Sequence, residues 1–202
     1  MAVIVVGGHS RNVGKTSVVA GLVAAISERQ WTAVKITQFG HGECSVNGEA
    51  CGCAVDEHTF AITEERDRAG KSDTSRFLVA GAARAIWVRT KQGCLAEAMP
   101  ALRRELGGAE NVIIESNSVL RFLRPDVYLT VLDPSTADFK ASSREYLDLA
   151  SAVILHHNPS DQNAMPAWKG VSLKPVAQRP VFYIQPPVYV TDEMVEFVRE
   201  NL

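Results

Sequence analysis

Apolar runs of strand length alternate along the chain with stretches of helical periodicity. Residues 3–7 and 152–155 contain no polar side chain, as is typical of strands buried on both faces of a parallel sheet. Five further runs are shorter or less continuous. The predicted strands are residues 3–7, 31–37, 84–88, 111–115, 126–132, 152–155 and 181–184.

Apolar residues that recur on one face predict helices between these strands. After the first strand the recurring residues are Val18, Val19, Leu22, Val23 and Ile26. The last helix has its own start signal, because Thr191 is a capping residue and two acidic residues follow it. The predicted helices are residues 15–30, 73–81, 95–106, 142–150 and 191–202.

Strands that alternate with helices predict an α/β fold, with a mainly parallel, doubly wound sheet and helices on both faces. Such sheets bind ligands at the carboxyl ends of their strands. Residues 38–58 form the one long insertion, which is rich in glycine and cysteine and has no helical period. We expect a single domain spanning residues 1–202, with this Cys-rich loop inserted into it.

A glycine-rich loop lies between the first predicted strand and the first predicted helix. Five residues separate Gly8 from Gly14, one more than in the usual phosphate loop, and Lys15 and Thr16 follow. Backbone N–H groups of such a loop and the helix N-terminus favour a polyphosphate. The alternative is a glycine turn before a helix whose lysine is solvated. The predicted nucleotide-binding residues of the loop are Ser10, Arg11, Asn12, Val13, Gly14, Lys15, Thr16 and Ser17.

Other polar residues follow predicted strands and are candidates for the same site. Glu115 ends the strand at 111–115, where a Mg²⁺ ligand is expected beside Thr16, and we expect it to act on the metal and not on the fold. Asp67 and Asp73 flank a charged turn, so either could orient a water or be a solvated charge. Asn158 could read a base edge or form a turn before Pro159.

Cys44, Cys51 and Cys53, here called the cysteine cluster, fall within the insertion. With His58, or with His41, they could complete a tetrahedral zinc site. An iron–sulfur cluster and free thiols are the alternatives. We take Cys44, Cys51, Cys53 and His58 as the predicted zinc ligands.

The composition excludes several classes of function. The 202 residues carry a net charge of −2, so no basic surface predicts nucleic-acid binding. The first residues have no basic region and no long apolar run, so the sequence predicts neither a signal peptide nor a membrane span. We expect a cytoplasmic protein, in which cysteines are thiols or metal ligands.

The loop ending in Val13, Gly14, Lys15 and Thr16 resembles the dethiobiotin synthetase and cobyrinic acid diamide synthase group of phosphate-loop NTPases. Residues 70–76, with 80–82 after them, resemble the molybdopterin-guanine dinucleotide biosynthesis adapter family, as does the strand that ends in Glu115. The resemblance implies that Lys15 and Thr16 bind phosphate and Mg²⁺ and that Asp67 and Glu115 lie near the metal. We therefore expect Lys15, Asp67 and Glu115 to be the catalytic residues.

Departures from these families keep several functions open. Ser116 follows Glu115 where the adapter family has glycine, the cysteine cluster is additional, and no Asn-Lys-x-Asp motif chooses between ATP and GTP. The first hypothesis is a slow accessory NTPase that acts through a partner enzyme of cofactor biosynthesis. An ATP-dependent ligase using Lys35 is the second, and a nucleotide-gated metal-binding module the third. A homodimer is also open, because Arg11 could replace the lysine that dimeric relatives insert across their interface.

Overall fold

The computed structural model describes residues 1–39, 59–157 and 166–202. Its strands form one sheet in the order β3-β4-β2-β5-β1-β6-β7-β8. The strands are β1 (Ala2–Gly8), β2 (Thr32–Phe39), β3 (Phe60–Glu64), β4 (Arg84–Lys91), β5 (Asn111–Glu115), β6 (Val127–Leu132), β7 (Ala152–His156) and β8 (Val181–Ile184). The helices are α1 (Lys15–Ala25), α2 (Asp73–Val79), α3 (Leu95–Glu105), α4 (Ala141–Glu145) and α5 (Asp192–Glu200).

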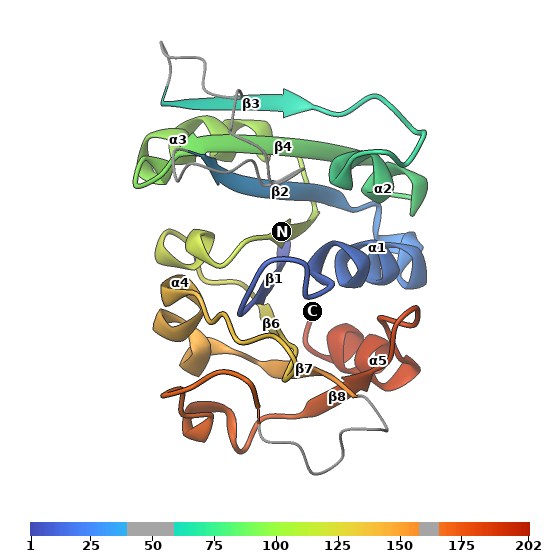
Figure 1. The fold of residues 1–202 in the computed structure, drawn as a ribbon. Coiled ribbons are helices and arrows are strands. Elements are labelled where there is room, and N and C mark those ends of the chain that lie inside the picture. Colours follow the sequence, from blue (N-terminus) through green and yellow to red (C-terminus); the bar gives the residue numbers. More distant parts are fainter. Residues whose placement is uncertain (40–58, 158–165) are drawn as a thin grey trace.

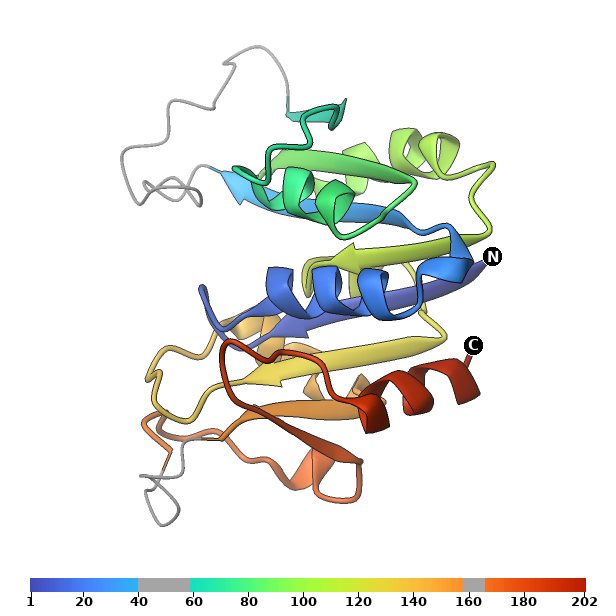
Figure 2. The same cartoon turned by 90° about the vertical axis from the view of Figure 1, so that its right-hand side faces the viewer.

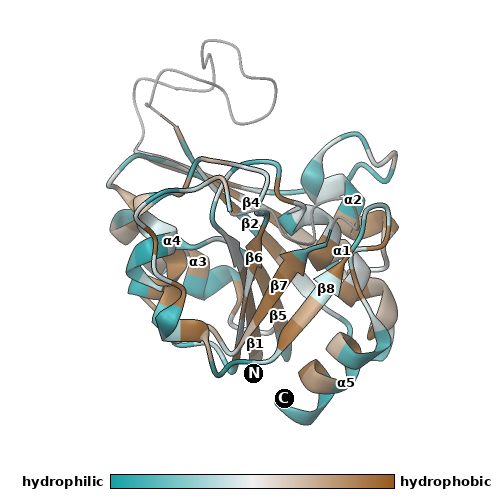
Figure 3. Cartoon of the chain, turned by 60° about the horizontal axis from the view of Figure 1, so that its bottom comes forward, coloured by the Kyte–Doolittle hydropathy of each residue, from teal (hydrophilic) through white to brown (hydrophobic). Residues whose placement is uncertain are grey.

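Helices cover both faces of the sheet (Figure 1). One apolar core joins α1, α2 and α5 to the sheet, and the second joins α3 and the short helix η2 (Ser118–Arg121) to the opposite face. The alternation of side chains along β1 shows the division, because Ile4 and Val6 belong to the first core and Val3 and Val5 to the second. Figure 2 shows the sheet face-on, with α1, α2 and α5 in front of the strands, and in Figure 3 the apolar strands lie between the helices of the two layers. The predicted doubly wound α/β fold is confirmed.

The sheet is parallel except at one edge. β3 runs antiparallel to β4, and the sequence analysis missed this strand. It is a short edge strand of partly buried residues, so its hydrophobic signal is weak. Two predicted helices were too long: α1 ends at Ala25 before the short helix η1 (Ser27–Arg29), and the helix expected at 142–150 is α4 followed by η3 (Leu147–Leu149).

β1 is a central strand, with β5 and β6 as its parallel neighbours. The chain builds β2 and β4 outward on one side of it and β6, β7 and β8 on the other. The carboxyl end of β1 is therefore the point where the winding direction reverses, and open α/β sheets bind ligands there. In the described residues, no helix is both long enough and apolar enough to span a membrane.

Candidate phosphate-binding site

The loop between β1 and α1 turns sharply through two residues with left-handed backbone. Asn12 has φ 57° and Gly14 has φ 87°. A Cβ atom on Gly14 would lie 2.5 Å from the ring of Tyr189, so both the conformation and the space require glycine. The His156 ring closes the same side, because its Nε2–H donates to the Val13 carbonyl at 2.9 Å.

The N-terminus of α1 lacks the side-chain cap and the acidic first turn that α2 and α5 have. In α2 and α5 the side chains of Ser72 and Thr191 accept a backbone N–H, and acidic residues lie in the first turn. α1 begins after Gly14 with no capping side chain and no acidic residue in its first turn. Since the first N–H groups of a helix need an acceptor and favour negative charge, this end is suited to an anion.

Lys15 is the cation nearest this helix end in the sequence. Its Nζ donates to the Ser10 carbonyl at 2.6 Å, so the side chain folds back over the loop. Burial lowers the pKa of Lys15 to about 8, against the opposing charge of Glu115, and the neighbouring Lys140 and Lys35 add to the lowering. Among the described residues no carboxylate is bonded to Lys15, so this largely desolvated ammonium can accept an anionic partner.

Oxygen atoms from three elements meet beside Thr16, the second residue of α1. The Thr16 hydroxyl donates to Glu115 Oε2 at 2.7 Å. The Lys35 ammonium donates to Glu115 Oε1 at 2.9 Å and to Thr16 Oγ1 at 3.3 Å, and it is ion-paired with Asp73. Burial lowers the pKa of Lys35, but the charges of Glu115 and Asp73 outweigh it, so the pKa lies above its ordinary value.

The register of the sheet explains this meeting. β2 and β5 are parallel neighbours, and Lys35 lies directly beside Glu115 in their ladder. The phosphate loop predicted from the sequence implies Mg²⁺, and the donor set fits it, because the hydroxyl of Thr16 and the two carboxylates are the hard oxygen ligands that this ion prefers. A cation already lies among these oxygens, namely the ammonium of Lys35.

The side chain of Asn117 is hydrogen-bonded to the backbone at the start of the loop. Its Oδ1 accepts the Gly8 N–H and its Nδ2 donates to the Gly8 carbonyl, both at 2.9 Å. A Cβ atom on Gly7 would lie 2.0 Å from Asn117 Oδ1, so glycine there allows the close approach. The loop is thereby joined to β5 through the residues that follow Glu115.

His9 joins the loop to the segment after β6. The ring is buried and neutral, because Nδ1–H donates to the Asp138 carbonyl at 2.7 Å and Nε2 accepts the Asp133 N–H at 3.0 Å. It packs against the rings of Phe139 and Trp168, at centroid distances of 5.1 and 5.0 Å. The dominant effect of burial lowers the pKa of His9.

Two more hydrogen bonds strengthen these connections. The Ser10 hydroxyl donates to Asp138 Oδ2 at 2.7 Å. Arg76 of α2 donates to the hydroxyl of Ser17 at 2.9 Å, and its guanidinium lies 3.8 Å from Asp73. The loop is thus held from β5, from the segment after β6 and from α2.

The structure brings only some of the predicted site residues together. The predicted residues 10–17 form the loop and the first turn of α1, and Glu115 is bonded to Thr16. Asp67 lies in an exposed turn, where its carboxylate accepts the Ala69 N–H at 2.8 Å. Its catalytic role stays a prediction. Five predicted site residues lie outside the described residues: Asn158, expected at the base, and the expected zinc ligands Cys44, Cys51, Cys53 and His58.

Several residues of the site were not predicted together from the sequence. Lys35 and Asp73 were expected in separate roles, and no role was predicted for His9, Asn117 or Asp138. Their positions gave a partial signal: Asn117 comes two residues after β5, and Asp138 lies in the segment after β6. Both segments follow the carboxyl end of a strand beside β1.

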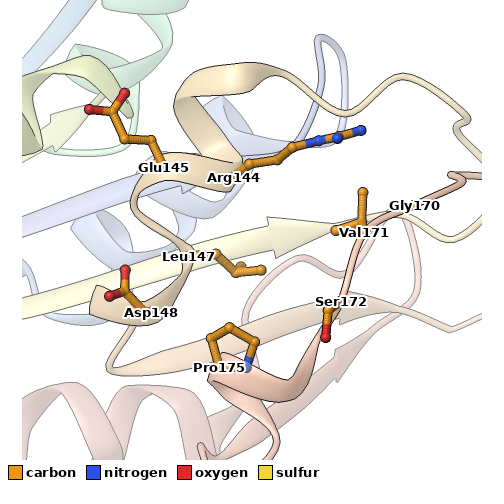
Figure 4. Close-up of a pocket in the computed structure, with 8 residues that line it drawn as sticks. All are labelled: Arg144, Glu145, Leu147, Asp148, Gly170, Val171, Ser172 and Pro175. Atoms are coloured by element: carbon orange, nitrogen blue, oxygen red, sulfur yellow. The ribbon is translucent and has the colours of Figure 1, made fainter.

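A surface hollow elsewhere shares no residue with this loop. Figure 4 shows it between the α4–η3 segment and residues 170–175. Its lining residues are Arg144, Glu145, Leu147, Asp148, Gly170, Val171, Ser172 and Pro175. It lies apart from the uncapped end of α1, so it is not the phosphate-binding site.

Solved structures of other proteins share this architecture at low sequence identity. LpxK from Aquifex aeolicus, in complex with ATP, is 15% identical with a TM-score of 0.51; the match covers 91% of this chain and 53% of that one. HypB from Helicobacter pylori, in complex with nickel, is 16% identical with a TM-score of 0.49 and coverage of 98% and 84%. A Zn(II)-bound triple mutant of the YjiA GTPase is 10% identical, with a TM-score of 0.48 and coverage of 96% and 60%.

No protein-family model matches the sequence, and neither does any curated protein. The chain spans about half the length of the LpxK chain that it matches. At these identities the similarity shows the fold alone, a mainly parallel α/β sheet with helices on both faces.

Proposed function

We propose that this chain binds a nucleoside triphosphate together with Mg²⁺ and hydrolyses it slowly. The observation that carries the proposal is the N-terminus of α1, which has no capping side chain and no acidic residue and which follows the glycine loop and begins with Lys15 and Thr16. Satisfied helix ends need no ligand, whereas this one offers several N–H groups and a buried lysine to one.

Each residue has a role that follows from its position. Lys15 would turn from the Ser10 carbonyl to the β- and γ-phosphates, because it gains a charged acceptor in place of a neutral one. Thr16 and Glu115 would hold Mg²⁺, which when bound neutralises charge on the phosphates. Asp67 and Asp73 are the candidates for orienting the attacking water. Asn158 is the candidate for contacting the base, and both ATP and GTP are admitted.

We favour the accessory NTPase over the ligase. A ligase needs cationic groups available to a second, small substrate. In the nucleotide-free protein the three N–H donors of Lys35 are directed to Thr16, Glu115 and Asp73, so Lys35 is not held in place for such a substrate. From the sequence resemblance we further propose that the nucleotide state is read by a partner enzyme of cofactor biosynthesis.

The cysteine cluster adds a proposal that rests on the sequence alone. Cys44, Cys51 and Cys53 with His58 would bind one zinc ion close in sequence to β2, the strand that carries Lys35. Thiolates and imidazole are the ligands that zinc prefers in structural sites.

Thermal unfolding with and without nucleotide tests the proposed function. A ligand that binds only the folded protein at 100 times its Kd stabilises it by about 2.7 kcal/mol. For a chain of this length that corresponds to a rise in Tm of roughly 5–11 °C. We expect this rise with MgATP or MgGTP for the wild type and for K169A, a variant of an exposed lysine, and no rise for K15A. Equal shifts in K15A and the wild type would contradict the proposal.

A further inference from the structure

The Lys35 ammonium lies where three oxygen-bearing side chains converge. They come from different parts of the fold: Thr16 from α1, Glu115 from the end of β5 and Asp73 from the start of α2. The side chain of Lys35 is 15% exposed and that of Glu115 is 6% exposed, so water has little access to the pair. A lysine ammonium has three N–H donors, and each has one of these oxygens as its acceptor.

These contacts are made to the same oxygen atoms that a divalent metal ion would need. The Thr16 hydroxyl donates its proton to Glu115 Oε2, and its oxygen accepts from Lys35. A metal ion bound to Thr16 would lie next to the Lys35 ammonium, and the two positive charges would repel each other. Likewise, a metal ion on Glu115 Oε1 would replace the ammonium 2.9 Å away. The ammonium and the metal ion therefore compete for one set of oxygens.

We propose that Lys35 is an internal cation that holds the metal site in the nucleotide-free protein and must leave it before Mg²⁺ binds. The proposal rests on the proposed function, since it assigns the regulation of the same site. Lys35 neutralises Glu115 and Asp73 while no metal is bound, so the site is stable without metal. It also lowers the affinity for metal alone, so the phosphates of a nucleotide are needed to draw the ion in.

The departure of Lys35 would also change the start of α2. Asp73 is the first residue of α2, and it is ion-paired with Lys35 and lies 3.8 Å from Arg76. Arg76 in turn donates to Ser17 in the first turns of α1. Occupation of the metal site is thereby coupled to α2, the helix that packs against α1, β2 and β4 on this face of the sheet.

Binding of Mn²⁺ alone, followed by electron paramagnetic resonance without nucleotide, tests the proposal. Removal of the competing cation should tighten Mn²⁺ binding about ten-fold or more in K35M, because close charge pairs in buried sites couple strongly. K35Q guards against poor folding of K35M, since its amide still donates to the oxygens; it removes the charge but keeps this contact, so a smaller tightening in the same direction is expected there. K169M removes an exposed lysine and should bind Mn²⁺ as the wild type does.

A second control separates competition for the oxygens from the general effect of a lost positive charge. K15M removes a cation that contacts the Ser10 carbonyl and none of the three oxygens. Competition predicts a much smaller change in K15M than in K35M. Equal tightening in the two variants, or no tightening in K35M and K35Q, would overturn the proposal.

The two proposals fail in different ways. A wild-type protein that binds no nucleoside triphosphate in a separate titration contradicts the proposed function. A wild-type protein that binds MgATP or MgGTP, with Mn²⁺ affinity unchanged in K35M and K35Q, contradicts only the role of Lys35.

Discussion

Replacement of Glu115 by glutamine should destabilise the protein even without nucleotide. The carboxylate accepts hydrogen bonds from Thr16 at 2.7 Å and from Lys35 at 2.9 Å, and its side chain is only 6% exposed. Glutamine keeps the shape and one acceptor oxygen but removes the charge. The sequence alone favoured a Glu115 that acts on the metal and not on the fold, and the ion pair with Lys35 changes that expectation.

The size of the effect follows from what remains around Lys35. Removing one partner of a buried ion pair costs about 3–5 kcal/mol. Asp73 still faces the ammonium in the variant, and its side chain is 41% exposed, so water also reaches that side. We therefore expect E115Q to lower the free energy of unfolding by about 1–3 kcal/mol, because part of the buried charge stays compensated. At roughly 2–4 °C per kcal/mol for a chain of this length, Tm falls by about 2–12 °C.

Urea unfolding and calorimetry in chelator, without nucleotide, measure this effect. E64Q is the matched control, because Glu64 pairs with Arg84 at 2.6 Å in an exposed ion pair, whose loss should cost about 1 kcal/mol or less. In the double variant E115Q with K35M the cost should be smaller than the sum of the two single variants, since no buried charge is left without its partner. Unchanged stability in E115Q, with additive effects in the double variant, would refute the buried ion pair as a source of stability.

Three further predictions follow from the loop and from the insertion. Burial holds the pKa of His9 below its ordinary 6.5. As the pH drops below about 6.5, His9 is therefore protonated in the unfolded chain before it is protonated in the folded protein, and the free energy of unfolding falls. Urea unfolding from pH 5 to 8 should show this fall in the wild type and a smaller fall in H9Q. G14A should lose nucleotide binding and about 1 kcal/mol or more of stability, because φ is 87° and the new methyl would meet Tyr189; calorimetric binding equal to that of the wild type would be inconsistent with the loop geometry. Protein purified without added metal should contain about one zinc per chain, and elemental analysis that finds none, with every thiol open to a thiol reagent, would exclude the zinc site.

The sequence predicts those features that depend on neighbours along the chain. The apolar strands, the turn at Gly14 and the Thr191 cap are local, and the structure has each of them. The parallel, doubly wound sheet is also predictable, because strands that alternate with helices form such sheets, but this alternation does not give the order of the strands.

The contacts of the site could not be predicted, because they join residues far apart in the chain. Lys35 and Glu115 meet only because β5 lies between β1 and β2. His9 has no apolar or motif signal of its own, and its role follows from the backbone of Asp133 and Asp138 after β6. The edge strand β3 was missed for a related reason, since its pairing with β4 and not its own pattern defines it.

Titration calorimetry of the wild type and K15A with ATP and GTP tests the central claim most directly. The uncapped end of α1 and the buried ammonium of Lys15 predict binding of at least one of the two nucleotides by the wild type. Affinity should be stronger with Mg²⁺ than in chelator, and K15A should show no detectable heat of binding. A wild type that binds neither nucleotide in the presence of Mg²⁺, or a K15A variant that binds as tightly as the wild type, would contradict the account.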